Sequence, residues 1–466
     1  MPKSAPVEVD QSQRNLGPIW LSPGVTRFNV LALFYCCALT IVFVTTLGLL
    51  YPYLLHEHLK MPTDIQGDFT GNLTVIAEIA AILVVVPAGM LSDRLGRRPL
   101  YVIGFLIVAA SFALLPLVRS PGVLILVRVL MAVGLSTCLM MLASVIADYP
   151  QNPSRGKLIS INGVITGVCV VLVASLLFAQ LPSYFIERGF APIQSGTYTF
   201  WLVAAAALAA ALVARLGLKG GHATRQREFT PFVKLLRTGM GEVRKNPRLG
   251  LTCAAYFVSR GDLAIFVIFF SLWIVAVGTD AGVSVADAQS TAGRLFGVSQ
   301  LAMLLFTPVM GVIVDRFDRV TALAIAMAIA TVGYLALGLV GDPFSSSWIY
   351  LVAILGGAGE ACVVVSGPAL VGQEAPARIR GSIIGMVGLF GAVGVLIHSK
   401  IAGMLFDVWM YQAPFVYMAV FNAIVCVAAI VVRVVYGSSK GAVHEQMLKS
   451  AERGGPQPAL AADESG

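Results

Sequence analysis

The sequence predicts an all-α membrane protein whose twelve transmembrane helices form two pseudo-symmetric six-helix bundles. Composition is the first observation, because 58% of the 466 residues are hydrophobic and only 12% are charged, whereas soluble domains carry about 25% charged residues. The second is a series of twelve apolar runs, each near the length of about 20 residues that crosses a bilayer. The third is a short motif after the second run that recurs after the eighth, which indicates a duplicated six-helix unit.

The twelve runs fall into two groups of six, separated by a polar stretch. The first six lie near 28–54, 71–91, 100–118, 122–147, 157–181 and 198–218. The second six lie near 249–278, 291–314, 320–341, 347–372, 381–406 and 412–436. We therefore expect one bundle over 28–218 and a second over 249–436, joined by a basic cytoplasmic linker at 219–248.

The remaining segments are polar. Residues 1–27 lack the apolar core of a signal peptide and are expected to form a cytoplasmic N-terminal segment. Residues 437–466 are rich in Gly, Ala, Ser and charge, which is typical of a disordered cytoplasmic tail. In the linker, Thr230-Pro231 is typical of a helix start. The rest of the linker is then either an amphipathic helix on the membrane surface or a mobile connection.

Positive charge indicates the orientation. The net charge is +8, and about 25 of the 32 Lys and Arg residues fall on the cytoplasmic side if both termini lie there. The opposite orientation would reverse this asymmetry. We therefore expect an integral protein of the plasma membrane (the inner membrane of a bacterium) with cytoplasmic termini. The basic charge is explained by topology, so no nucleic acid is expected as a partner.

Sequence signals of soluble chemistry are missing. There is no phosphate-binding Gly-Lys loop, which argues against ATP hydrolysis, and there is no nucleophile elbow or His/Cys metal cluster. The seven cysteines all lie in apolar runs, so we expect no disulfide. The sequence therefore predicts neither an enzyme nor a bound cofactor or metal.

The loop between the second and third runs carries a dense motif. Its residues are Gly89, Leu91, Asp93, Arg94, Gly96, Arg97 and Arg98. They match the pattern G-x-L-x-D-R-x-G-R-R, and in this loop the chain resembles the major facilitator superfamily. The resemblance implies a latch that stabilises an outward-facing state. A glycine permits close helix approach or a tight turn, and a carboxylate can face a helix N-terminus or pair with arginine. Alternatively, Arg97 and Arg98 serve only topology.

A partial copy of the motif follows the eighth run. It consists of Gly311, Asp315, Arg316 and Arg319. Asp318 stands where the pattern has glycine, and Val320 replaces the last basic residue. Arg155-Gly156 before the fifth run and Arg380-Gly381 before the eleventh form a second repeated pair. The two matches in register support a duplication.

Two further patterns of the superfamily are degraded or missing. Arg128 and Gly134 match only part of an R-x-x-Q-G-x-G pattern in the fourth run. The fifth run has Gly163 and Gly167 but lacks the Gly-Pro dipeptide of drug antiporters. The degraded pattern in the fourth run counts against a proton-coupling role, and the missing Gly-Pro dipeptide counts against antiport without excluding it.

Six charged residues stand out inside the apolar runs, because placing a charge at mid-bilayer costs about 2.5–3.5 kcal/mol. They form the candidate substrate and proton pathway: Glu78, Arg128, Arg260, Asp262, Glu360 and Lys400. Glu78 and Arg128 are expected at similar depth, where they could form an ion pair. Lys400 could instead reach the interface through its flexible stem.

Three of these residues have alternative interpretations. Glu360 lies about halfway along its run, behind the flexible run 356–359, and is either a proton carrier or a structural hydrogen-bond partner of the next helix. Arg260 and Asp262 flank Gly261 and point about 200° apart on an intact helix. Either each side chain has its own partner, or Gly261 breaks the helix to build a site, or the span starts after both residues.

The first run contributes hydroxyl groups. Thr40, Thr45 and Thr46 suit a polar lining, whereas Tyr51 and Tyr53 are expected in the interfacial aromatic belt.

The family resemblance implies a secondary transporter that works by alternating access. Its solute site would lie near mid-membrane between the bundles, lined by spans 1, 4, 7 and 10. The mixed charges fit a polar or anionic solute, so the first hypothesis is proton-coupled uptake of a small organic solute. The alternative is a proton-antiport exporter of drugs or metabolites. A third hypothesis, from another class, is a transporter-like membrane sensor without transport. The expected partners are a small-molecule substrate and the lipid bilayer, and the protein is expected to function as a monomer.

Overall fold

The structure is a computed structural model that describes residues 15–220, 232–345, 347–376 and 379–437. The expected disordered tail and the Thr230-Pro231 helix start lie outside these residues. Within them, twelve helices are long and apolar enough to cross a membrane. The predicted all-α, twelve-span fold class is therefore confirmed.

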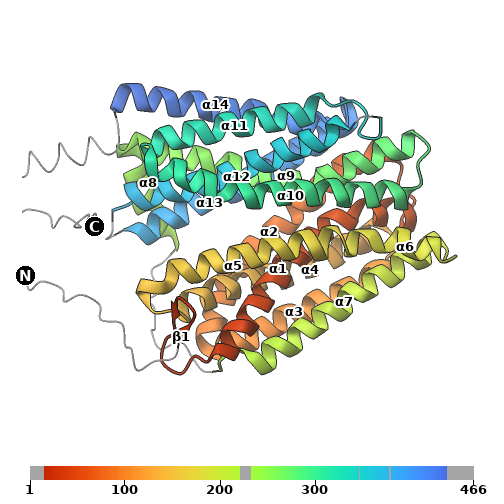
Figure 1. Cartoon of the computed structure of the whole chain (residues 1–466), viewed down its shortest axis with the longest axis horizontal. Helices are drawn as coiled ribbons and strands as arrows, with labels where there is room; N and C mark the ends of the chain where they lie inside the picture. Colours follow the sequence, from red (N-terminus) through yellow and green to blue (C-terminus); the bar gives the residue numbers. More distant parts are fainter. Residues whose placement is uncertain (1–14, 221–231, 346, 377–378, 438–466) are drawn as a thin grey trace, which may run out of the picture.

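The two predicted bundles lie side by side (Figure 1). The N-terminal bundle contains α1 (Arg27–Tyr53), α2 (Gln66–Leu95), α3 (Arg97–Leu114), α4 (Pro121–Asp148), α5 (Arg155–Cys169), α6 (Leu181–Glu187) and α7 (Pro192–Gly217). The C-terminal bundle contains α9 (Pro247–Asp280), α10 (Val285–Arg316), α11 (Arg319–Leu339), α12 (Trp348–Glu374), α13 (Arg380–Val408) and α14 (Ala413–Tyr436). π-helical turns at Leu54–His58 and Val170–Ser175 prolong α1 and α5.

The first described residues, α8 (Phe232–Lys245) and the end of α14 lie at the same end of the bundles (Figure 1). We call this the inner end, because the sequence predicts that it faces the cytoplasm, and the opposite end the outer end.

The segment before α1 is folded, whereas the sequence indicated only a polar cytoplasmic segment. Strands β1 (Asn15–Leu16) and β2 (Ile19–Trp20) pair antiparallel. The Trp20 N–H donates to Ser154 Oγ (3.0 Å), and the Gln151 N–H donates to the Trp20 carbonyl (2.9 Å). This hairpin therefore braces the α4–α5 connection at the inner end, a contact across more than a hundred residues that local sequence patterns do not show.

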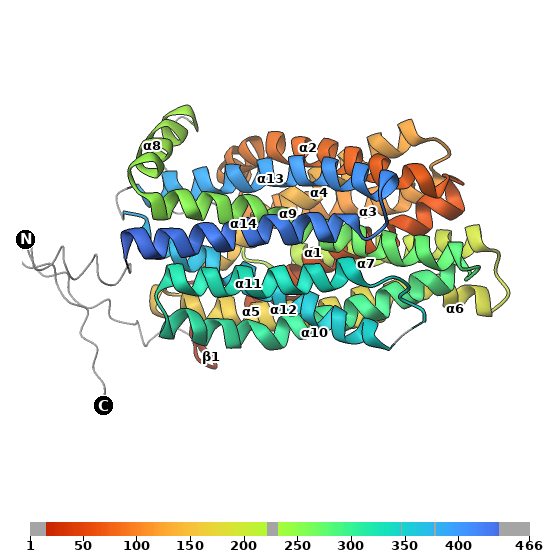
Figure 2. The same ribbon diagram turned by 90° about the horizontal axis from the view of Figure 1, so that it is seen from above.

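Helix α8 lies at the inner end beside α13 (Figure 2). Met240 and Val243 pack with Leu249, Ile383 and Met386 of the C-terminal bundle. The linker therefore contains a helix, as one of the two alternatives predicted. Its apolar side chains Met240 and Val243 pack against the protein.

Glycines set how closely the C-terminal helices pack. A Cβ at Gly357 would lie 2.0 Å from the Ser299 carbonyl oxygen of α10, and one at Gly359 would lie 2.9 Å from the Cα of Ala330 in α11. α12 is a continuous helix through the run 356–359. The glycines that the sequence suggested as flexible are instead places of close helix approach.

The bundles are bonded to each other in their outer halves. Ser271 Oγ of α9 donates to the Leu49 carbonyl of α1 (2.8 Å), and Gln180 Nε2 donates to the Ser290 carbonyl of α10 (3.0 Å). A Cβ at Gly403 of α13 would lie 2.4 Å from the Gly67 carbonyl oxygen of α2.

Four glycines in the inner halves of α5, α10 and α13 have no close neighbour from another helix. At Gly163 of α5, Gly311 of α10, and Gly385 and Gly388 of α13, a Cβ would meet no atom within 4 Å. The described residues therefore form close contacts between the bundles at the outer end, and these four positions in the inner halves form none.

Candidate functional site

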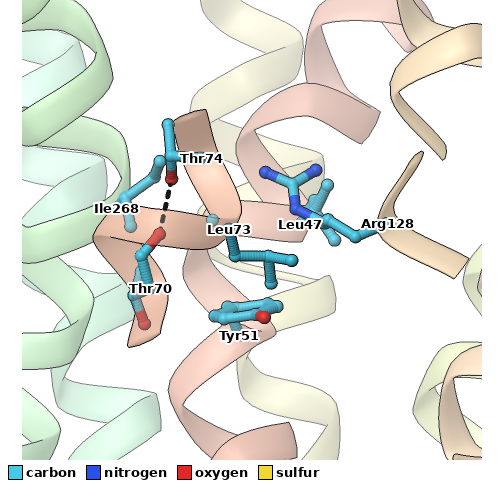
Figure 3. A pocket seen from close by; sticks show the side chains of 8 residues that line it. Leu47, Tyr51, Thr70, Leu73, Thr74, Arg128 and Ile268 are labelled. Carbon is cyan, nitrogen blue, oxygen red and sulfur yellow. Dashed lines mark hydrogen bonds between the residues drawn. The ribbon is translucent and has the colours of Figure 1, made fainter. Parts of the chain in front are cut away.

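A pocket at the seam between the bundles contains one of the six embedded charges (Figure 3). Its lining residues are Leu47, Gly48, Tyr51, Thr70, Leu73, Thr74, Arg128 and Ile268. The first seven come from α1, α2 and α4, and Ile268 comes from α9 of the other bundle. Arg128 reaches from α4 towards the turn of α2 that carries Thr70 and Thr74 (Figure 3).

Arg128 does not form the ion pair with Glu78 that the sequence suggested. Its guanidinium carbon lies 5.9 Å from the centre of the Tyr51 ring, a cation–π contact. Tyr51 is only 5% exposed and lines the pocket, so the prediction that it belongs to the interfacial belt is wrong. The similar depth of Glu78 and Arg128 did not predict their contacts, because the direction of each side chain determines which groups meet.

Two hydroxyl groups of this pocket are buried without a hydrogen-bond partner among the described residues. They belong to Tyr51 and Thr70. The neighbouring Thr74 is different, because its hydroxyl donates to the Thr70 carbonyl (2.8 Å). Sequence analysis missed Thr70, and a signal was available: Thr70, Thr74 and Glu78 recur at a spacing of four, which places them on one face of α2.

Glu78 and Arg260 lie along the same seam, towards the inner end. Glu78 is half-buried on α2, one turn beyond Thr74, and Arg260 is exposed on α9. Arg260 is the positive group that acts electrostatically on Glu78. It lies two turns before Ile268, so it is about 12 Å further inward than the pocket. A charge from each bundle therefore lies on the inner side of the pocket.

α9 is continuous through Arg260, Gly261 and Asp262, so the broken-helix alternative is wrong. The alternative in which the span starts after these residues stays a prediction. A Cβ at Gly261 would lie 2.5 Å from the His398 ring of α13, so this glycine serves helix packing. Asp262 is 1% exposed and accepts hydrogen bonds from Asn422 Nδ2 of α14 at 3.0 and 3.1 Å. It lies inside the C-terminal bundle and does not line the seam, which corrects its place in the proposed pathway.

Glu360 also lies inside the C-terminal bundle. Its side chain is 2% exposed, and its Oε2 accepts a hydrogen bond from Gln300 Nε2 of α10 (3.1 Å). The structure thus contains the hydrogen bond to a neighbouring helix that one alternative described. A neutral amide partner leaves the carboxyl group able to bind a proton, so the proton-carrier hypothesis stays a prediction.

Lys400 forms an ion pair with the other bundle. Its Nζ lies 2.5 Å from Asp68 Oδ1, so it pairs α13 with α2 across the seam. Close by, the Asp407 carboxylate of α13 accepts the backbone N–H groups of Gly67 (2.8 Å) and Asp68 (2.6 Å) in the first turn of α2. We call Asp68, Lys400 and Asp407 the outer clasp. Sequence analysis missed Asp68 and Asp407, because an acidic residue near the end of a span has no distinctive pattern.

The first motif lies at the inner end of α2. Gly89 faces α4, where a Cβ would lie 2.8 Å from Met140 Cε, and Gly96 has a φ of 91°. Arg97 donates to Asp148 Oδ2 of α4 (3.1 Å) and to Ser92 Oγ (2.7 Å). Arg94 is exposed and Arg98 is half-buried, and the Asp93 side chain lies outside the described part. Arg97 therefore has a packing contact in addition to any role in topology.

The second motif is built differently. Asp315 pairs with Arg319 (3.4 Å), and Arg316 is exposed. Asp318 accepts the N–H groups of Val320 and Thr321, so the residue that departs from the family pattern caps the N-terminus of α11. In the second motif, a helix cap formed by Asp318 therefore stands where the first motif has the turn at Gly96. At Gly311 no close approach occurs.

The family model of the Major Facilitator Superfamily matches residues 32–284 and 252–460. The chain belongs to this superfamily. It is an integral membrane protein, and membrane transport is the activity of the family. Among the described residues, no group of three or more His, Cys, Asp or Glu side chains is placed to hold a metal ion.

Proteins that are similar to the chain include the following three. It is 29% identical to the magnetosome protein MamH of Paramagnetospirillum magneticum over 86% of this chain and 91% of that protein. It is 28% identical to the magnetosome protein MamZ of Magnetospirillum gryphiswaldense over 79% of this chain but only 56% of MamZ. It is 27% identical to the probable nitrate transporter NarT of Staphylococcus epidermidis over 70% of this chain and 77% of NarT.

Solved structures of the superfamily share the fold. The nucleoside transporter NupG has a TM-score of 0.66 at 15% identity, covering 87% of this chain and 99% of NupG. A bacterial homologue of the human lysosomal transporter Spinster, in an inward-facing and unoccupied conformation, has a TM-score of 0.64 at 18% identity. The match covers 88% of this chain and 97% of the homologue. At these identities the likeness shows the fold alone.

Proposed function

We propose that this superfamily member takes up a small polar or anionic organic solute by proton-coupled alternating access. The observation that carries the proposal is the asymmetry of the contacts between the bundles: hydrogen bonds join them in their outer halves, whereas four inner-half glycines of α5, α10 and α13 have no close neighbour from another helix. A solute held between the bundles near mid-membrane would be separated from the outside by these contacts. NarT is named as a probable transporter of an anion, which supports an anionic solute here.

Glu360 is the proposed proton carrier. Its carboxyl group is buried at mid-span on α12 and bonded to a neutral amide, Gln300. A carboxyl group without a cationic partner can be neutral in one state of the cycle and charged in another, because burial disfavours the charge unless water or a cation reaches it. Asp262 is a weaker candidate, because Asn422 binds both of its oxygens.

The test uses purified protein in liposomes and a solute chosen by a thermal-shift screen of metabolites, since a bound ligand stabilises the folded state. Under an imposed pH gradient, acid outside, the wild type should accumulate the solute. Glu360→Gln should still exchange solute across the membrane but lose accumulation driven by the gradient. The matched control is Glu187→Gln at the exposed end of α6, which should accumulate normally. Unchanged accumulation by Glu360→Gln would contradict the proton-carrier assignment.

The same liposomes separate the other hypotheses. A proton-antiport exporter would move solute against the direction of the proton flux, and a sensor without transport would show no flux at all. We further propose that the protein works as a monomer in the inner membrane of a bacterium with both termini in the cytoplasm. The bacterial relatives and the basic inner-end segments support this placement.

A further inference from the structure

The fifth span is irregular at residues 170–180, between α5 and α6. A π-helical turn, Val170–Ser175, is followed by a 3₁₀ turn, Phe178–Gln180. In the π-helical turn the Leu176 N–H donates to the Val171 carbonyl (3.1 Å), which lies five residues back. Such turns are uncommon inside helices and often mark functional positions. We call residues 170–180 the α5–α6 joint.

The α5–α6 joint lies where the N-terminal bundle packs on α10 of the other bundle (Figure 1). A Cβ at Gly293 would lie 2.6 Å from Ala179 Cβ and 2.9 Å from the Ser175 carbonyl oxygen. A Cβ at Gly297 would lie 3.2 Å from Ser175 Cβ. α10 is one continuous helix over this contact. The irregular backbone therefore lies on the N-terminal side of the contact, and glycines of α10 leave room for it.

Gln180 joins the α5–α6 joint to α10. Its Nε2 donates to the Ser290 carbonyl of α10 (3.0 Å), and its Oε1 accepts the Ser290 hydroxyl. The same Nε2 donates to the Ser175 carbonyl at the end of the π-helical turn (3.0 Å). A carbonyl at a helix end needs a partner, above all in a membrane. One amide group therefore bonds the two bundles and satisfies the irregular turn.

The contact with α10 and the irregular backbone stabilise each other. If Ser290 moved away, Gln180 would lose the partner that holds its amide beside the π-helical turn. A regular α-helix through the α5–α6 joint would satisfy its backbone groups without Gln180. That helix would turn the face carrying Ser175 and Gln180 by about 100°, away from α10. The 3₁₀ turn can take up the residue that the π-helical turn releases, so neither form leaves a gap in the chain.

We propose that the α5–α6 joint is a two-state switch, which keeps its π-helical turn while Gln180 is bonded to Ser290 and becomes a regular α-helix when the bundles separate at the outer end. This inference rests on the proposed alternating access and assigns it a moving part. The outer clasp joins α2 to α13 through charged groups, whereas the α5–α6 joint meets α10 through an amide and a hydroxyl group. Both contacts must break before the outer end opens.

The first test measures the distance across this contact in liposomes that contain no solute. Spin labels are placed at Glu187 of α6 and at Ala281 just before α10, both exposed, after the native cysteines have been replaced. Gln180→Leu removes two hydrogen bonds to Ser290, so the ratio of long to short distances should rise about 10-fold. Gln194→Leu is the matched control, because Gln194 Oε1 accepts the Ala191 N–H (3.4 Å) within the N-terminal bundle. It should leave the distances unchanged.

The second test examines the backbone. Leucine at Gly293 would push the α5–α6 joint away from α10, because even a Cβ there would meet Ala179. In the structure of Gly293→Leu, determined by electron cryo-microscopy, residues 170–175 should form a regular α-helix. Should this variant not fold, deletion of Leu172, which is 54% exposed, removes the extra residue of the π-helical turn. After this deletion Gln180→Leu should cause no further change in the distances, because Gln180 no longer faces Ser290.

The inference is overturned if the π-helical turn persists in Gly293→Leu, or if Gln180→Leu leaves the distances as Gln194→Leu does. It is also overturned if Gln180→Leu has its full effect after deletion of Leu172. Any of these results in a protein that transports a solute would sink this inference alone. Distances that change as expected in a protein with no flux would sink the transport proposal and leave the switch standing.

Discussion

Replacing Asp407 by asparagine should open the outer end. The Asp407 carboxylate accepts two backbone N–H groups from the first turn of α2, at 2.8 and 2.6 Å. Hydrogen bonds to a charged group contribute about 1.5–3 kcal/mol each, and a negative charge at a helix N-terminus adds about 0.3–1 kcal/mol. Asparagine keeps one acceptor oxygen and loses the charge. The carboxylates of Asp64 and Asp68 act against the Asp407 charge, and water screens this half-exposed site, so we take a loss of about 2 kcal/mol. The ratio of open to closed outer ends should then rise about 30-fold.

The assay is a distance measurement between two spin labels across the outer end. Cysteines at Glu187 of the N-terminal bundle and Gly341 of the C-terminal bundle carry the labels, and both positions are exposed. The seven native cysteines are first replaced. In Asp407→Asn the population at long distance should grow relative to the parent.

Two further variants calibrate the result. Gly403→Leu should force the outer end open, because even a Cβ there would lie 2.4 Å from the Gly67 carbonyl oxygen. Asp280→Asn is the matched control, because the hydrogen bond of Asp280 with Tyr411 (2.8 Å) stays within the C-terminal bundle. If Gly403→Leu opens the outer end while Asp407→Asn leaves the distances unchanged, the reasoning about the clasp is refuted.

Two other substitutions test the C-terminal bundle. Asn422→Leu removes both hydrogen bonds from the buried Asp262 carboxyl group. It should lower the free energy of unfolding by about 1–3 kcal/mol, which is measured as a lower thermal unfolding midpoint. Adding Asp262→Leu should recover much of the loss, and a double variant as unstable as Asn422→Leu alone would contradict this account. Gly357→Ala should destabilise the protein severely, because its Cβ would lie 2.0 Å from the Ser299 carbonyl oxygen, whereas Gly385→Ala, with open space around it, should be nearly neutral in the same thermal assay.

The fold was predictable because hydropathy alone defines the spans of a membrane protein. A helix in lipid needs an unbroken apolar run, so each of the twelve runs corresponds to a helix. The role of Asp318 could not be predicted from its position in the motif. In the family pattern it is a departure from glycine, and only its hydrogen bonds show that it caps the N-terminus of α11.

The candidate site was only partly predictable. The 200° separation of Arg260 and Asp262 indicated correctly that the two side chains do not face each other, but it could not tell which one lines the seam. That choice depends on Asn422, which is 160 residues away. Likewise, Lys400 meets Asp68 across 332 residues. A sequence shows that a charged side chain in the membrane needs stabilising partners, and the tertiary fold determines which residues those partners are.

Helix α2 is thirty residues long, which is about 45 Å. Its outer tip is held by the clasp, and its inner tip carries the first motif. The inner part of α2 packs on α4 at Gly89, so one helix connects the outer contact between the bundles to the first motif. An inhibitor that separates Gly67 from Gly403 from the outside would therefore act on the cycle without entering the pocket and without resembling the solute.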